Sequence, residues 1–217
     1  MNYLAHARCG LNDPYWVAGT SLPDWMNVVD RKNRARRVRA AAVVDHPDPR
    51  IASLARGCLQ HHQDDAWFHQ TETFVQLSAA LAVALRDMLP PGSGHQAGFV
   101  GHVALELLLD SVLMERDPHL LDRYYRALAD LDLDALVEGA CRICLRPAPG
   151  LRELVPRFIE VRFLADYRDD FRLLYRLNGV MRRVGLPPLP DRVCEWLAQA
   201  RGRVRQAADQ LLTPTTP

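Results

Sequence analysis

Lysine is almost absent from this sequence, and histidine is absent from its second half. Lys32 is the single lysine beside 26 arginines, and all eight histidines lie within the first 119 of the 217 residues. The segment 120–217 therefore cannot supply an imidazole to a catalytic or metal site. The formal net charge of +1 lacks the basic excess that nucleic-acid-binding proteins normally carry. We therefore expect no nucleic-acid partner.

The sequence also lacks a disulfide framework and a long apolar run. Its five cysteines are odd in number and widely scattered, which favours a reducing compartment, so we expect a cytoplasmic protein. The N-terminus has no basic segment followed by a continuous apolar stretch, as a secretory signal would have. No segment offers the roughly 18 to 20 apolar residues of a membrane helix. We therefore expect no membrane span.

Helical periodicity dominates the chain, and no alternating apolar and polar run predicts a strand. The sequence predicts an all-α fold: a single-domain helical bundle of about nine helices over residues 1–212, with a metal site between helices. We expect a metal-site half over 1–115, a helical scaffold over 116–212 and a frayed tail over 213–217. The predicted helices lie near 2–8, 15–20, 23–37, 48–65, 70–89, 95–115, 118–130, 134–144, 150–184 with a break, and 190–212.

The helix predicted near residues 95–115 is strongly apolar but carries acidic residues. His102, Glu106 and Asp110 are spaced i, i+4 and i+8, so they share one face of that helix. A buried ionised carboxylate needs a counter-charge, because losing water without a partner costs many kcal/mol. A metal ion or a buried arginine would supply that charge; otherwise the pKa of the carboxyl group must rise so that it is protonated and neutral.

A second predicted helix repeats this spacing. His61, Asp65 and His69 are again i, i+4 and i+8, an arrangement by which the helices of a bundle present metal ligands. Imidazole nitrogen and carboxylate oxygen together suit Zn²⁺, Mn²⁺, Fe²⁺ or Co²⁺ better than Ca²⁺ or Mg²⁺. His62 and Asp64 flank this set, and we interpret them as exposed polar residues or as partners that support the ligands.

The N-terminal region adds two candidates, His6 and Asp24. His6 lies in the opening MNYLAHA, and Asp24 follows Pro23. Because proline is common in the first turn of a helix, Asp24 is interpreted either as a metal ligand or as the cap of a helix that begins there.

These N-terminal motifs resemble those of bacterial acyl-carrier-protein phosphodiesterases. MNYLAHA and the G-x-x-x-x-D of Gly19 to Asp24 are similar to the family's opening M-N-[FY]-L-A-H and its later G-N-x-x-x-D-F. The segment GCLQHHQDD over 57–65 is similar to the family's G-I-x-L-H-R-x-I-D. The resemblance spans residues 1 to about 115.

The resemblance implies an all-α, HD-domain-like metallohydrolase that removes phosphopantetheine from acyl carrier protein with a divalent metal, usually manganese. It implies metal-site roles for His6, Asp24, His61 and Asp65. The chain departs from the family at Phe68-His69, where the family has T-D, and at His102 to Glu106, where it has D-x-x-x-D-H-F. Both departures keep residue types that bind metals but change the type of ligand. They therefore support a metal site in this chain and weaken the inference that it shares the family's substrate. The order of ligands also resembles zinc-dependent phospholipase C in pattern.

The candidate ligands are too many for one ion of four- to six-fold coordination. They are His6, Asp24, His61, Asp65, His69, His102, Glu106 and Asp110. Their four carboxylates carry four negative charges, which two divalent ions would neutralise, with Asp24 or Asp65 as the bridge. The cofactor is therefore predicted to be Mn, Zn or Fe, as a pair of ions or as one ion with the remaining residues around it.

A basic segment follows Asp24. Six cationic side chains occur within residues 31–39, and guanidinium groups suit phosphate or an acidic protein surface. We predict that Arg34, Arg36 and Arg37 bind an anionic phosphorylated substrate, which could be carried on an acidic carrier protein. The alternative is a solvated basic face of a helix.

These features together predict a metal-dependent hydrolase of phosphodiesters or other phosphoesters, in which metal-bound hydroxide attacks phosphorus. His46 or His62 would protonate the leaving oxygen. Two alternatives stay open. One is a non-catalytic helical domain with a buried ion-pair network that involves arginines such as Arg157 or Arg162. The other is a metal-binding helical bundle with different chemistry, such as thiol transfer.

Overall fold

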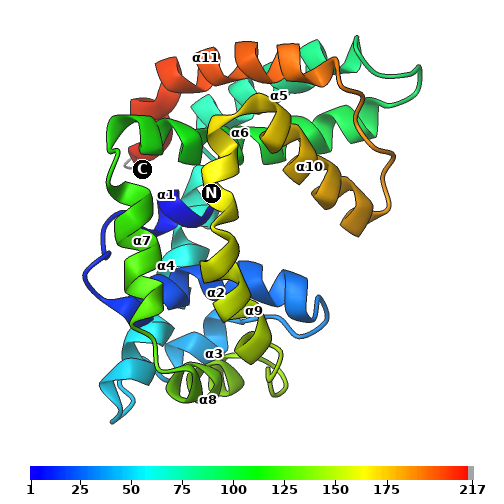
Figure 1. Ribbon diagram of the computed structural model, residues 1–217. Coiled ribbons are helices and arrows are strands. Elements are labelled where there is room, and N and C mark those ends of the chain that lie inside the picture. The colour runs from blue at the N-terminus through cyan, green and yellow to red at the C-terminus, as the bar shows by residue number, and fades with distance from the viewer. Residues whose placement is uncertain (215–217) are drawn as a thin grey trace. The chain divides into compact units, whose positions relative to one another are not determined.

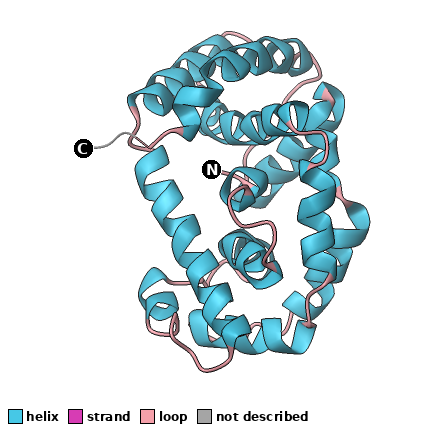
Figure 2. Cartoon of the chain, turned by 90° about the vertical axis from the view of Figure 1, so that its left-hand side faces the viewer, coloured by secondary structure: helices cyan, strands magenta, loops and turns pink. Residues whose placement is uncertain are grey.

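The computed structural model describes residues 1–214, which form helices joined by loops (Figure 1, Figure 2). No strand occurs within that range, so the predicted all-α class is confirmed. The α-helices in the described residues are α1 (Tyr3–Ala7), α2 (Pro14–Val29), α3 (Arg37–Ala41), α4 (Pro49–Phe68), α5 (Glu72–Arg86), α6 (Gly94–Arg116), α7 (Leu120–Ala129), α8 (Leu133–Ile143), α9 (Leu151–Val161), α10 (Asp170–Val184) and α11 (Val193–Leu212). A 3₁₀ helix, η1, covers Phe163–Arg168.

Helix α2 passes through Pro23 without ending. Separate helices were expected over 15–20 and 23–37, but α2 is one helix, and α3 begins only after a loop. Asp13 caps the first turn of α2 by accepting two backbone N–H groups. Asp24 therefore lies inside a helix, and its predicted alternative role as a helix cap is wrong.

The break expected within 150–184 occurs at Arg162. This residue ends α9 in the left-handed region, with φ of 48°, and such a residue terminates a helix. Asp169 then caps α10 by accepting the N–H of Arg172. The predicted long helix is therefore divided into α9, η1 and α10.

The described chain divides into two compact units, and each unit combines segments that are distant in sequence. Unit 1 contains Met1–Asn2, Trp67–Pro118 and Phe163–Pro217, and unit 2 contains Tyr3–Ala66 and His119–Arg162. The single domain predicted over 1–212 stays a prediction. Of the tail predicted to fray, residues 215–217 lie outside the described residues, whereas the Thr213 hydroxyl donates to the Asp209 carbonyl at 2.7 Å.

Unit 2 has an aromatic core between α1, α2, α7 and α9. The Phe158 ring meets Tyr3, Trp25 and Tyr125 at centroid distances of 5.1, 5.6 and 5.7 Å. These rings are at most 7% exposed, and buried aromatic side chains contribute large apolar areas to a core. This core fixes α1 and α2, the two helices that carry the N-terminal candidate residues.

Unit 1 is built around α6, which packs beside α5 and α11 (Figure 1). Gly101 of α6 lies against the backbone of α5, where a Cβ would approach the carbonyl of Ser78 and the nitrogen of Ala82. Trp196 of α11 donates its indole N–H to the Leu81 carbonyl at 3.2 Å.

Within residues 1–214, α6 is the helix long and apolar enough to cross a membrane, and 72% of its most apolar window is buried. A core helix passes the same test, so the expectation of no membrane span stays a prediction.

Candidate functional site

Two glycines bring α2 and α4 into backbone contact in unit 2. A Cβ atom on Gly19 would meet the carbonyl oxygen of Leu54, and a Cβ atom on Gly57 would meet the carbonyl oxygen of Trp16. No side chain larger than hydrogen fits at either position without moving a helix. This close approach sets the distance between Thr20, which follows Gly19 on α2, and His61, which lies one turn after Gly57 on α4.

His61 lies one turn after Gly57 and is held by α2. Its Nδ1 lies 2.8 Å from the carbonyl oxygen of Thr20, in the turn that precedes Pro23. Because a carbonyl oxygen only accepts, Nδ1 carries the proton and the Nε2 of the neutral ring carries a lone pair.

His6 lies on α1 and is 1% exposed. Its Nδ1 lies 3.0 Å from Asp64 Oδ2, and the other oxygen of Asp64 accepts the Gln60 amide at 2.8 Å. A carboxylate accepts hydrogen bonds, so the ring proton of His6 is on Nδ1. The buried Nε2 of His6 has no hydrogen-bond partner among residues 1–214. A buried polar atom without a partner requires an explanation, such as an ion that occupies its lone pair.

The two Nε2 atoms converge on Asp65, and we define His6, His61 and Asp65 as cluster A. His6 Nε2 lies 3.4 Å from Asp65 Oδ1, and His61 Nε2 lies 3.4 Å from Asp65 Oδ2. The ligand atoms of all three residues lie within 4.8 Å of one another. The imidazoles are stacked, with centroids 4.1 Å apart, so a charge on both rings would be repulsive. The Nε2 lone pairs of the two rings and the Asp65 carboxylate repel one another. A cation bound between them would remove that repulsion.

The pKa shifts in cluster A indicate a site that attracts positive charge. Burial alone would lower the pKa of His6, but the carboxylates of Asp64 and Asp65 beside its ring raise it above the ordinary value. Burial alone would raise the pKa of Asp65, but the imidazoles of His6 and His61, when they carry a proton on Nε2, hold it well below its usual range. A proton or a metal ion would satisfy the same negative potential.

A second group lies in unit 1, and we define His69, His102 and Glu106 as cluster B. The Nε2 atoms of His69 and His102 lie 2.8 and 3.3 Å from the same oxygen, Glu106 Oε1. The amino nitrogen of Met1 lies 3.2 Å from that oxygen. Burial alone would raise the pKa of Glu106, but the amino group and the two imidazoles hold it well below its usual range. Glu106 is therefore an ionised acceptor, and the Nε2 of His69 is its donor.

The structure brings together six of the eight predicted ligands, three in each cluster. Asp24 and Asp110 belong to neither cluster. Asp110 is fully buried and accepts the side-chain amide of Asn2 at 2.8 Å. Their predicted roles as metal ligands stay predictions.

The two arginines named for a buried ion-pair network have other partners. Arg157 bonds Glu160 at 3.0 Å. Arg162 bonds Asp122, and its guanidinium lies 4.7 Å from the centroid of the Tyr125 ring. Histidines, rather than these arginines, lie beside the carboxylates of both clusters.

The predicted proton donors lie outside both clusters. The Nε2 of His62 lies 3.2 Å from the carbonyl of Ala35, and burial, the neighbouring His61 and the positive charge of Arg37 lower the pKa of His62. His46 accepts the backbone N–H of Asp48 at 3.1 Å. Of these two residues, His62 is the one adjacent to a ligand of cluster A.

The predicted substrate-binding arginines are exposed and lie on the segment that His62 contacts. Arg34 and Arg36 flank Ala35, whose carbonyl bonds His62, and Arg37 begins α3. All three arginine side chains are exposed. The basic segment therefore lies beside the face of α4 that carries His62.

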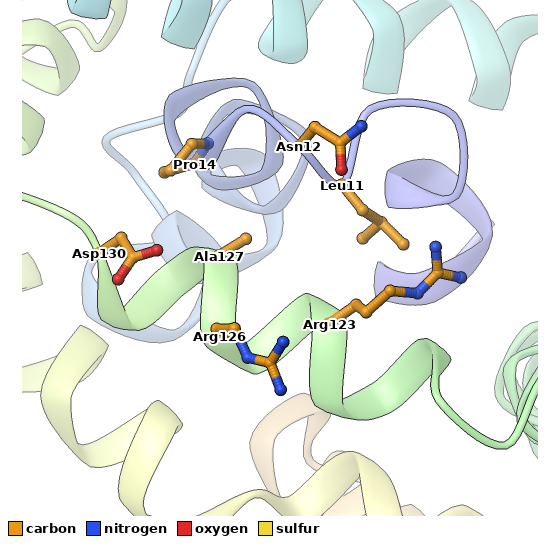
Figure 3. Close-up of a pocket in the computed structure, with 7 residues that line it drawn as sticks. All are labelled: Leu11, Asn12, Pro14, Arg123, Arg126, Ala127 and Asp130. Atoms are coloured by element: carbon orange, nitrogen blue, oxygen red, sulfur yellow. The ribbon is translucent and has the colours of Figure 1, made fainter.

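A separate open cavity of about 270 Å³ lies in unit 2 (Figure 3). It is lined by Leu11, Asn12, Pro14, Arg123, Arg126, Ala127 and Asp130. None of these residues belongs to cluster A or to the predicted site. The cavity therefore shares no lining residue with cluster A.

Sequence reasoning did not settle the role of Asp64 and missed that of Thr20. Asp64 is 4% exposed and holds the ring proton of His6, which excludes its interpretation as an exposed polar residue. The position of Asp64 three residues after His61 carries no signal that distinguishes it from Asp65. A backbone carbonyl, such as that of Thr20, is invisible in a search for ligand side chains.

No family model matches the chain, and neither the curated proteins nor the solved structures give a significant match. The resemblance to acyl-carrier-protein phosphodiesterases therefore stays a prediction. Function is therefore inferred from the geometry of the two clusters.

Proposed function

We propose that the chain is a metal-dependent phosphoester hydrolase whose metal centre is cluster A. One observation carries the proposal: the buried Nε2 of His6 has no hydrogen-bond partner among residues 1–214 and lies 3.4 Å from the Asp65 carboxylate. Nε2 of His61 faces the other oxygen of that carboxylate at the same distance. Three ligand atoms thus surround a point at which a cation would replace unfavourable contacts.

The donor set of cluster A fits a borderline divalent ion. Two imidazole nitrogens and one carboxylate suit Zn²⁺, Mn²⁺ or Fe²⁺ and are a poor match for Ca²⁺ or Mg²⁺. Three protein ligands leave at least one coordination position for water or substrate, as in catalytic zinc sites. A bound ion there would supply a Lewis acid and lower the pKa of coordinated water toward neutrality.

The residues around the ligands prepare them for this role. Asp64 and the Thr20 carbonyl hold the ring protons on Nδ1, so both Nε2 atoms present lone pairs to the ion. Such second partners are a regular feature of metal-binding histidines. They fix the orientation of each ring before the metal arrives.

His62 and the basic segment would act on the substrate. Guanidinium groups of Arg34, Arg36 and Arg37 would attract a phosphorylated anion, including one carried on an acidic protein. With a lowered pKa and Nε2 bonded to Ala35, His62 is better suited to accept a proton than to protonate a leaving oxygen. The same chemistry is compatible with the expected cytoplasmic location.

Hydrolysis of bis(p-nitrophenyl) phosphate and p-nitrophenyl phosphate by the full chain, loaded with Mn²⁺ or Zn²⁺, tests the proposal. Replacing the ligands with the double variant His61→Ala, Asp65→Ala should lower the rate by about 100-fold or more, because the metal's transition-state stabilisation is lost. The metal measured by elemental analysis should fall by one ion per chain. Circular dichroism should show unchanged helical content.

The matched control is His95→Ala, which removes an exposed histidine outside both clusters. It should retain the rate and the metal content of the unmodified chain. Unchanged metal in the double variant would contradict the assignment of cluster A. Bound metal at cluster A without hydrolysis of either ester would contradict the hydrolase and favour a metal-binding bundle with other chemistry.

A further inference from the structure

We propose that cluster B is a second divalent-metal site, located within unit 1, that binds its ion more weakly than cluster A. The proposal concerns His69, His102 and Glu106, and it does not depend on the hydrolase activity. Its ligand class is a borderline ion such as Zn²⁺, Co²⁺ or Ni²⁺, because two of three donors are imidazole nitrogens.

The three residues come from two elements that hold them in position. His102 and Glu106 are one turn apart on α6, and His69 directly follows α4. The nearly buried ring of Phe74 lies 4.9 Å from the centroids of both imidazoles. This aromatic contact restricts the rotation of the two ligand rings and keeps their Nε2 atoms directed at Glu106.

The ligand atoms of cluster B already lie within the space of one ion. They lie within 4.8 Å of one another, and both imidazoles approach the same oxygen of Glu106. The side chains of His69 and His102 are 33% and 43% exposed, whereas that of Glu106 is 16% exposed. The carboxylate thus forms the floor of the site, and the open side of the two rings leaves coordination positions for water or an exogenous ligand.

Binding at cluster B requires a rearrangement that cluster A does not need. The Nε2 of His69 donates to Glu106 at 2.8 Å, so this nitrogen must lose its proton before it can coordinate a metal. In cluster A, Asp64 and the Thr20 carbonyl already hold the protons on Nδ1. Since such partners are worth about 10–100-fold in metal affinity, we expect cluster B to be weaker by about that factor.

Calorimetric titration of the metal-free full chain with Zn²⁺ tests the proposal, and a parallel Co²⁺ titration reports coordination geometry by visible absorption. The unmodified chain should bind two ions in two steps. The double variant His69→Ala, His102→Ala, which alters partly exposed side chains, should lose the weaker step and keep the tighter one. The variant His61→Ala, Asp65→Ala should show the opposite pattern.

If the double variant does not fold, the single variant His102→Ala tests the same site. It should weaken the second binding step by at least about 10-fold. His95→Ala should leave both steps unchanged. A single binding step in the unmodified chain, or a second step that survives loss of both cluster B histidines, would overturn the proposal. Phosphoester hydrolysis is measured on the same variants. The titration tests metal binding at cluster B and the hydrolysis assay tests the proposed hydrolase, so a failure of one proposal is distinguished from a failure of the other.

Discussion

Clusters A and B have the same ligand chemistry but different proton positions. Each combines two histidines with one carboxylate, and in each the nearby atoms are Nε2 and carboxylate oxygen. In cluster A both Nδ1 atoms have acceptors, and the Nε2 atoms lie 3.4 Å from the carboxylate. In cluster B the Nε2 of His69 carries a proton and donates it in a 2.8 Å hydrogen bond to Glu106.

The difference shows that a list of ligand types does not define a metal site. The second ring nitrogen decides which tautomer is present, and therefore whether Nε2 offers a lone pair or a proton. Cluster A has the proton arrangement that metal coordination requires, whereas a metal at cluster B would have to displace existing hydrogen bonds. The substitutions proposed at Gly57 and Asp64 disturb cluster A and use cluster B as an internal reference.

The largest effect is expected from Gly57→Ala. The added methyl group meets the Trp16 carbonyl, so α2 and α4 must separate, and the Thr20 carbonyl then moves away from His61. We expect a loss of about 1–3 kcal/mol in the free energy of unfolding and loss of the tight metal-binding step, with the cluster B step retained. Thermal unfolding and Zn²⁺ titration measure the two effects.

Gly202→Ala is the matched control for that change. Gly202 lies in α11, where a Cβ would meet no atom within 4 Å, so alanine should stabilise the chain by about 0.5–1 kcal/mol. Equal effects of the two substitutions on stability and on metal binding would refute the role given to the glycine contact.

The next largest effect is expected from Asp64→Ala. The substitution leaves every ligand of cluster A in place but removes the acceptor that holds the ring proton of His6. Metal affinity at cluster A should fall by about 10–100-fold, whereas affinity at cluster B should not change. Asp64→Asn, which keeps an accepting oxygen, should recover part of the loss in the same Zn²⁺ titration. Undiminished affinity in Asp64→Ala would contradict the tautomer argument.

Phe74→Leu should have a smaller effect and should act on cluster B. The aromatic ring that contacts both His69 and His102 is lost, so we expect a several-fold weaker second step and a stability loss of about 1 kcal/mol. Phe158→Leu, at a buried ring of unit 2, supplies a similar stability loss without a direct contact to cluster B. Weakening of the second step by both variants alike would point to a general loss of stability.

The smallest effect is expected from Cys58→Ala, next to Gly57 on α4. Burial, with a further contribution from Cys144, raises the pKa of the Cys58 thiol to about 12, so the thiol stays protonated at neutral pH and is a poor metal ligand. Metal affinity at cluster A should be unchanged. The Co²⁺ complex should lack the intense near-ultraviolet band of a thiolate ligand, and such a band, lost on substitution, would show that sulfur coordinates.

Periodicity in the sequence was sufficient to predict the helical class and two neighbouring pairs of histidine and carboxylate. His61 with Asp65, and His102 with Glu106, are pairs at i and i+4, and this spacing alone places both members on one helix face. His6 followed only from the opening motif, because nothing local relates it to residues about 55 positions later. The pair His61 with Asp65, together with His6, named every member of cluster A.

The partition of ligands between clusters could not be predicted in this way. His69 continues the spacing of His61 and Asp65, but α4 ends at Phe68, and His69 joins Glu106 instead. The continuity of α2 through Pro23 depends on packing, which overrides the local preference of proline to end or begin a helix. The contact at Gly19 and Gly57 is likewise a tertiary feature, since a glycine in sequence does not reveal what it touches.

The most direct test of the central claim is a crystal structure of the full chain with one equivalent of Zn²⁺, with the ion located by anomalous scattering. The account predicts a peak in cluster A, about 2.0–2.2 Å from His6 Nε2, His61 Nε2 and an oxygen of Asp65. The Nδ1 atoms should remain bonded to Asp64 and to the Thr20 carbonyl. A first equivalent that occupies cluster B, or that leaves the Nε2 of His6 uncoordinated, would contradict it.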